Sequence, residues 1–149
     1  MTTPDIDALV GNRMDESAAD DLLQSAGVGV LSLARDGEAY GVPVSFGYDG
    51  GDRLYFVFVG FGEESRKEAF AADTERASFA AYDVAGTDDW RSVVVAGPVE
   101  RVAEDDWERA REALGDNAWY PSLFSTADPM RHVALWSLRI EEKTGLQSG

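Results

Sequence analysis

The sequence predicts a mainly β domain, an antiparallel barrel of six strands with short peripheral helices. Apolar or alternating segments of strand length recur at fairly even spacing, tight turns join most of them, and only short helical patterns lie between. These three observations favour a closed or nearly closed antiparallel barrel over a doubly wound parallel sheet. Because the 149 residues contain no visible repeat or linker, we expect 1–149 to form a single domain.

Six segments carry the β-branched and aromatic residues that are typical of strands. They span 28–34, 39–49, 54–59, 76–84, 91–102 and 132–145. The turn Arg35-Asp36-Gly37-Glu38 between the first two contains Asp-Gly, which predicts a β-hairpin. The segment LYFVFV (54–59) is almost continuously apolar, so we expect it to be covered on both faces, at the centre of a barrel or of a dimer.

Three short segments have the residue spacing of helices. In 15–26 the apolar residues recur at helical intervals behind acidic residues that suit a first turn, and Gly27 is expected to end the helix. Shorter helices are expected at 65–72 and 104–114. The segment 118–130, which contains two prolines, is expected to form a loop.

The charge balance limits the partners that this protein can have. Acidic residues outnumber basic residues 28 to 13, and the net charge is −15. Attraction to nucleic acid or to an anionic membrane needs a clustered positive face, so we expect neither partner. The acidic excess is spread along the chain, as in proteins of salt-accumulating cells, and predicts a halophilic protein whose stability depends on salt.

Several kinds of chemistry are absent from the sequence. The chain contains no cysteine, which excludes disulfides, thiolate metal sites and cysteine nucleophiles. The first residues are acidic and lack the apolar segment of a signal peptide, and no stretch approaches 18 consecutive apolar residues, so we expect a cytoplasmic protein. The single histidine, His132, and the carboxylates form no pattern typical of a metal site or a catalytic triad, so no catalytic residue is predicted.

The triplet Ser65-Arg66-Lys67 is the most informative motif. It places two cations at the expected start of a helix, where the helix dipole disfavours positive charge. A phosphate bound there would gain backbone N–H groups, a serine hydroxyl and two charged donors, which suits a phosphomonoester. Alternatively, Glu63, Glu64 and Glu68 pair with these cations on a solvated surface. The residues alone leave both interpretations open.

The order of elements and motifs resembles the pyridoxamine 5'-phosphate oxidase-like family of FMN-binding split barrels, over about 15–145. In that family a helix precedes a hairpin, a third strand runs into a Ser/Gly-Arg-Lys helix start, and a valine-rich strand ends in glycine. The corresponding segments here read GVLSLARDGEAYGVPVSFGYD, LYFVFV, SRKEAF, DTERASFAAYDV and WRSVVVAGPVERV. The resemblance implies a six-stranded antiparallel split β-barrel.

The resemblance also implies a set of cofactor-binding residues. Arg66 and Lys67, with Ser65 as a helper, would hold the phosphate of FMN. The other implied residues are Pro43, Val44, Ser45 and Phe46 along the isoalloxazine ring, Phe58 and Val59 at the edge of the pocket, and Ser92, at a position where oxidases carry a flavin-contacting glutamine.

By this resemblance the protein is expected to be an FMN-dependent oxidoreductase that acts on a small molecule, as a homodimer with two equivalent cofactor sites at its interface. Pyridoxamine phosphate oxidases carry basic residues where Gly41 and Phe46 stand, and a C-terminal arginine and histidine that this sequence lacks. The pattern is closer to the short nitroimidazole-resistance type reductases. A deazaflavin coenzyme, and a non-catalytic flavin-binding or sensor module, are the alternatives.

Overall fold

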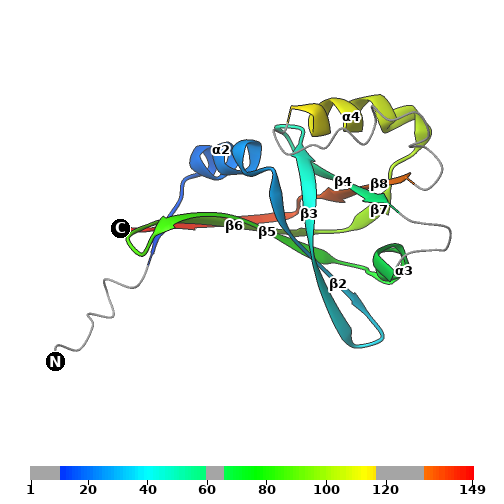
Figure 1. Ribbon diagram of the computed structural model, residues 1–149, viewed down its shortest axis with the longest axis horizontal. Helices are drawn as coiled ribbons and strands as arrows, with labels where there is room; N and C mark the ends of the chain where they lie inside the picture. The colour runs from blue at the N-terminus through cyan, green and yellow to red at the C-terminus, as the bar shows by residue number, and fades with distance from the viewer. Residues whose placement is uncertain (1–10, 60–65, 117–132) are drawn as a thin grey trace.

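The computed structural model describes residues 11–59, 66–116 and 133–149, and its architecture is mainly β with short helices, as predicted (Figure 1). The described strands form one antiparallel sheet of nine strands in the order β1-β9-β6-β5-β2-β3-β4-β8-β7. Their bounds are β1 (Asn12–Arg13), β2 (Val28–Arg35), β3 (Glu38–Tyr48), β4 (Arg53–Val59), β5 (Ala77–Gly86), β6 (Asp89–Gly97), β7 (Val99–Arg101), β8 (Val133–Arg139) and β9 (Glu142–Gln147).

Two pairs of consecutive strands are bent continuations of each other, and they close the barrel. β6 continues past Pro98 into β7, and β8 continues through 140–141 into β9. Because β8 pairs with β4 while β9 pairs with β6, the bent strand β8/β9 joins the two halves of the sheet. The ring β2-β3-β4-β8/β9-β6-β5 has six members, which confirms the predicted barrel, and β1 is a short addition beside β9.

The sequence predicted one strand where the structure has β6 and β7, and one where it has β8 and β9. The physical reason is a close backbone crossing at the two bends. Pro98 has no N–H to offer the ladder, and a Cβ on Gly97 would overlap the carbonyl oxygen of Arg139. Arg139 N donates to Pro98 O at 3.0 Å and Glu141 N donates to Ala96 O at 2.9 Å. These two backbone hydrogen bonds connect the bend after Gly97 to the bend after Arg139.

This crossing predicts a strong effect of a single methyl group. Gly97→Ala should lower the free energy of unfolding by about 3 kcal/mol, the upper end of the usual cost of overpacking, because the new Cβ meets backbone that cannot rotate away. Gly86→Ala is the matched control in β5, since its Cβ would meet nothing within 4 Å. Urea unfolding measures both, and equal midpoints for the two variants would contradict the crossing.

Helix α2 (Glu16–Ala26) begins and ends where the sequence predicts. Asp15 is the N-cap, and its Oδ1 accepts a hydrogen bond from Ala18 N at 2.7 Å. Gly27 ends the helix with φ 76°, a left-handed conformation that glycine adopts without strain. The buried side of the helix, including Leu22 and Leu23, joins the core of the barrel.

The other two helices also lie close to their predicted positions. α3 (Arg66–Asp73) packs against β2, and α4 (Trp107–Gly115), preceded by the 3-10 turn Glu104–Asp106, lies over β3 and β4 (Figure 1). None of the helices in the described residues combines the length and the apolar character needed to cross a membrane. The expected loop at 118–130 and His132 lie outside the described residues.

The segment LYFVFV is covered on both faces, as predicted. Phe56 points into the barrel, where it packs against Phe79 with ring centroids 5.4 Å apart, and Phe79 packs against Phe46 at 4.6 Å. Tyr55 points the other way, into a second buried cluster with Leu114 of α4. α4 therefore covers the outer side of β4, and the barrel core covers the inner side.

Candidate functional site

Strand β3 changes partner along its length, and this leaves one edge open. Residues 38–45 pair with β2, whereas only 46–48 pair with β4. Phe46 N donates to Gly27 O on the β2 side at 3.0 Å, so by the alternation of a strand the backbone of Pro43 points to the other side. Proline suits that position because it has no N–H. No described strand pairs with β3 along this edge.

Arg66 lies next to the beginning of β3. It is the first residue of α3, and its guanidinium lies 5.1 Å from the ring centroid of Tyr40 and 5.4 Å from that of Phe70. Arg66 Nη2 also lies 2.7 Å from Glu38 Oε1, in an ion pair whose side chains are 60% and 61% exposed. Such an exposed pair contributes little stability, so Glu38 can give way to a stronger anion.

The other residues of the predicted site divide between the inside and the outside of the barrel. Val44, Phe46 and Phe58 are buried in the core, so their side chains face other core residues. Pro43 is exposed and Ser45 half-buried, on the outer side of β3. Ser65 and the side chains of Val59 and Lys67 lie outside the described part of the chain.

The outer face of the barrel across five adjacent strands has a central area without charged side chains, and we call it the uncharged face; Glu142, opposite Ala96 in register, lies at its edge. In register, Pro43 lies beside Val30, Val30 beside Ala80, Ala80 beside Val94, and Val94 beside Thr144. The uncharged face consists of every second residue of five ranges, beginning with the first residue of each: 28–34, 39–45, 78–84, 90–96 and 144–146.

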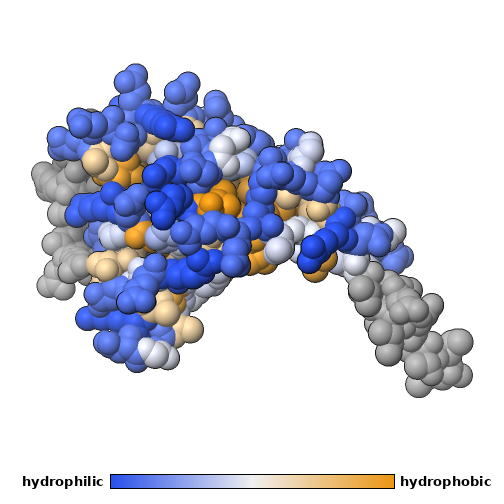
Figure 2. Space-filling model, turned by 180° about the vertical axis from the view of Figure 1, so that it is seen from behind, coloured by the Kyte–Doolittle hydropathy of each residue, from blue (hydrophilic) through white to orange (hydrophobic). Residues whose placement is uncertain are grey.

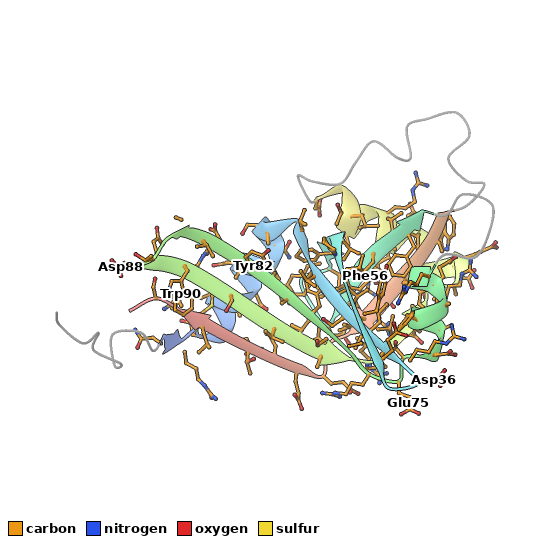
Figure 3. All side chains as sticks on the ribbon, turned by 60° about the horizontal axis from the view of Figure 1, so that its bottom comes forward. Asp36, Phe56, Glu75, Tyr82, Asp88 and Trp90 are labelled. Atoms are coloured by element: carbon orange, nitrogen blue, oxygen red, sulfur yellow. The ribbon has the colours of Figure 1, made fainter. Side chains whose placement is uncertain are left out.

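This face is unusual for so acidic a protein. Hydrophilic residues cover most of the surface seen from behind (Figure 2), and 28% of the chain is charged. The described large hydrophobic residues that are exposed all lie on the uncharged face, with exposures between 41% and 65%; they are Val28, Tyr82, Val84, Val94 and Leu146. Helix α2 lies behind these strands, and no helix crosses the face that Figure 3 turns toward the viewer.

Ser92 lies on the uncharged face, directly opposite Tyr82 in the register of β5 and β6. Arg66 lies instead at the hairpin end of β2 and β3, beside Glu38. Ser92 and Arg66 lie toward opposite ends of β2. The β2 residues that pair with β5 are Val30 to Ser32, and Ser92 lies beyond Val30, at the end away from the hairpin. Within one copy of the chain, the structure therefore does not bring Ser92 and Arg66 together.

The described residues offer no metal site, and the residues of the uncharged face include no histidine and no carboxylate. No group of three or more His, Asp or Glu side chains in the described part of the chain could hold a metal ion. Tyr48, whose pKa is raised by burial and by the Asp20 carboxylate that accepts its hydrogen bond at 3.0 Å, lies in the core.

The comparison with protein families identifies this architecture. The sequence model of the family described as pyridoxamine 5'-phosphate oxidase matches residues 15–147. The chain belongs to the pyridoxamine 5'-phosphate oxidase family. No protein with a curated description matches the sequence.

Solved structures share this fold of the pyridoxamine 5'-phosphate oxidase family at low sequence identity. A FAD-binding protein from Mesorhizobium loti is 20% identical with a TM-score of 0.74, over 93% of this chain and 98% of that one. The FAD-binding protein from Mycobacterium smegmatis is 19% identical with a TM-score of 0.70, over 92% and 98%. A proposed 5-nitroimidazole antibiotic resistance protein from Bacteroides thetaiotaomicron is 20% identical with a TM-score of 0.70, over 93% and 90%.

Membership of the pyridoxamine 5'-phosphate oxidase family was predicted from the sequence, but two features of the site were missed. The first is the aromatic support of Arg66 by Tyr40 and Phe70, which joins residues far apart in sequence. The second is the uncharged face. Its signal was present in the alternate residues of 28–34 and 78–84, none of which is charged, although only the strand order shows that they form one surface.

Proposed function

We propose that this protein binds FMN and acts as a flavin-dependent oxidoreductase on a small molecule. Membership of the pyridoxamine 5'-phosphate oxidase family supports a flavin, as do the similar structures that are named FAD-binding. The observation that carries the proposal is the placement of Arg66 at the first residue of α3, held over two aromatic rings, with the exposed Glu38 as its ion-pair partner among the described residues. The arrangement is suited to a phosphate group.

The phosphate of FMN fits this end of the site because its negative charge would neutralise the cations at the beginning of α3, which the helix dipole disfavours. A cation in the first turn of a helix opposes the helix dipole, whereas a phosphate there is stabilised by the dipole and by the N–H groups. Arg66 would donate to the phosphate, with Ser65 and Lys67 as further donors. The rings of Tyr40 and Phe70 keep the guanidinium in place, which lowers the entropy lost on binding.

The flat ring of FMN fits the open edge of β3. Backbone groups along 41–45 lie at an edge where no described strand pairs, and a ring with a hydrogen-bonding pyrimidine edge could use them. Pro43 and Ser45 lie on the outer side of that strand, while Phe46 and Phe58 give the strands a rigid support from within. FMN would supply the redox chemistry, and the protein would supply position and electrostatics.

We propose that two copies of the chain pair through the uncharged face. Four strands of seven residues and one of three, about 4.8 Å apart with a rise of about 3.3 Å per residue, give this face a projected area of roughly 490 Å², in the range of the largest patches that monomers usually expose. A second copy is the occupant that the charge favours. Two chains of net charge −15 repel each other least where neither carries charge, and an isologous contact matches this face to itself.

Pairing would also explain why the predicted residues do not meet within one copy. Ser92 lies on the uncharged face itself, so in a symmetric dimer it could approach the cofactor held by Arg66 of the partner subunit. Each interface would then contain two equivalent cofactor sites.

Two other readings have specific support. FAD in place of FMN is favoured by the names of two similar structures. A non-catalytic flavin-binding or sensor module is favoured by the lack of a histidine or carboxylate among the residues of the uncharged face. A deazaflavin coenzyme is a variant of the same redox function.

Flavin titration tests the proposal directly. We expect the purified protein to be yellow or, if stripped, to quench the fluorescence of added FMN at a stoichiometry of one per chain. Riboflavin, which lacks the phosphate, should bind more weakly. Tighter binding of FAD or of a deazaflavin would reassign the cofactor, and no binding of any of the four compounds would contradict the proposed function.

A further inference from the structure

A second candidate site lies on the other side of the barrel from the uncharged face, between the sheet and α4. It is a cavity of about 260 Å³, lined by residues from the beginning of β4, the end of β7 and the beginning of α4. Its volume is below the usual range for drug-sized ligands, roughly 300 to 1,000 Å³, so it suits a small ion or a single functional group.

The floor of this cavity consists of two buried hydroxyl side chains on neighbouring strands. Tyr55 of β4 and Ser137 of β8 lie directly opposite each other, and each is only 2% exposed. Burial raises the pKa of the Tyr55 phenol, so this hydroxyl keeps its proton and can donate. Both hydroxyls are therefore hydrogen-bonding groups at a buried position with a cavity in front of them.

The rim of the cavity concentrates positive charge. Arg53, Arg101 and Arg109 line it together with two carboxylates, those of Glu100 and Asp106, in a chain that carries only 13 basic residues. The charged lining is thus three arginines against two carboxylates, whereas the chain as a whole is at −15, and Asp49, outside the lining, pairs with Arg109 at 3.3 Å.

Two of these arginines, Arg53 and Arg101, are available to a ligand, since Arg109 is held by the Asp49 carboxylate, whose side chain is only 5% exposed. Arg53 Nη1 donates to Glu100 Oε1 at 3.0 Å and to Ser137 Oγ at 3.4 Å, but the Glu100 side chain is 63% exposed, so this pair is weak. Arg101 has no ion-pair partner in the part of the chain that the structure describes. A bound anion would gain Arg101 and share Arg53, with a hydroxyl beneath it.

We infer that this cavity binds a small oxyanion, such as the carboxylate or phosphate group of a metabolite. A planar guanidinium and two neutral hydroxyl donors are complementary to oxygen atoms that carry negative charge. The site is separate from the proposed flavin site, since Arg53 is the first residue of β4 whereas Arg66 comes after the last residue of that strand. The inference therefore goes beyond the proposed function.

The test is a titration of the full-length protein with inorganic phosphate and, separately, with acetate, at constant ionic strength, followed by amide chemical shifts. We expect chemical-shift changes confined to residues around the cavity. The ion that binds with the higher affinity shows whether the site prefers a phosphate or a carboxylate group. Arg53→Gln and Arg101→Gln should each weaken binding by roughly tenfold to a hundredfold. Because Arg101 has no described ion-pair partner, its variant tests the site even if Arg53→Gln unfolds.

Arg91→Gln is the matched control. Arg91 pairs with Asp83 on the neighbouring strand at 3.1 Å, with side-chain exposures of 38% and 61%, close to those of the Arg53 pair. Wild-type affinity in this variant supports the site. Equal weakening in all three variants, or shifts spread over the whole surface, would mean non-specific attraction and would overturn the inference. FMN affinity should be unchanged in Arg53→Gln, which separates this site from the flavin site.

Discussion

Replacing both Arg66 and Lys67 with alanine should lower the affinity for FMN by about two to four orders of magnitude. The substitution removes two charge-assisted contacts to the phosphate, each worth roughly 1.5–3 kcal/mol. The fold should survive, because Arg66 is 60% exposed and its ion pair with Glu38 lies at the surface. Fluorescence titration of wild type and variant measures the change.

Riboflavin provides the internal control for this result. It lacks the phosphate, so wild type and double variant should bind it about equally. Arg91→Ala is the control for charge, because it removes an arginine that also forms one ion pair with an exposed carboxylate but lies away from α3. If Arg66 and Lys67 are only surface ion-pair partners, the FMN dissociation constant of the double variant will be unchanged, and these residues do not belong to the site.

A single carboxylate on the uncharged face should break the homodimer. In Val94→Glu, a symmetric pairing would bury two like charges with no partner, at a cost of several kcal/mol, so the dimer dissociation constant should rise by two orders of magnitude or more. Val94 lies within the cross-strand row from Pro43 to Thr144 and is 44% exposed, so the fold of each chain should tolerate the change. Light scattering across a concentration series measures the shift.

Ser17→Glu is the control for the added charge. Ser17 is exposed on α2, which packs against the opposite side of the same strands, and an acidic residue suits the first turn of a helix. This variant should remain dimeric in the same buffer. A wild-type protein that is monomeric at micromolar concentration, or a Val94→Glu protein that dimerises as wild type does, would refute pairing through the uncharged face.

The sequence predicted those parts of the fold that depend on neighbouring residues. The hairpin follows from Asp36 and Gly37, both of which have positive φ in the structure, and α2 follows from its Asp15 cap and Gly27 stop. The bends after Gly97 and Arg139 were not predicted. They exist because two strands cross closely at these points, and the pattern within either strand alone does not contain the crossing.

The site shows the same limit. The motif at 65–67 gave the position of the cations, and α3 begins at Arg66 as expected. The sequence alone offered the neighbouring glutamates as alternative partners, whereas the described ion pair of Arg66 is with Glu38, 28 positions earlier in the chain. A contact of that kind depends on how the hairpin folds back over α3, so only the three-dimensional structure could identify it.

Native mass spectrometry of the purified protein tests the central claim most directly, because it weighs the assembly together with its cofactor. We predict a species with twice the mass of the chain plus two molecules of FMN, and a dimer that loses flavin without losing the partner chain when Arg66 and Lys67 are both replaced. A single chain without bound flavin, in a buffer where the protein is folded, would contradict both the dimer and the cofactor.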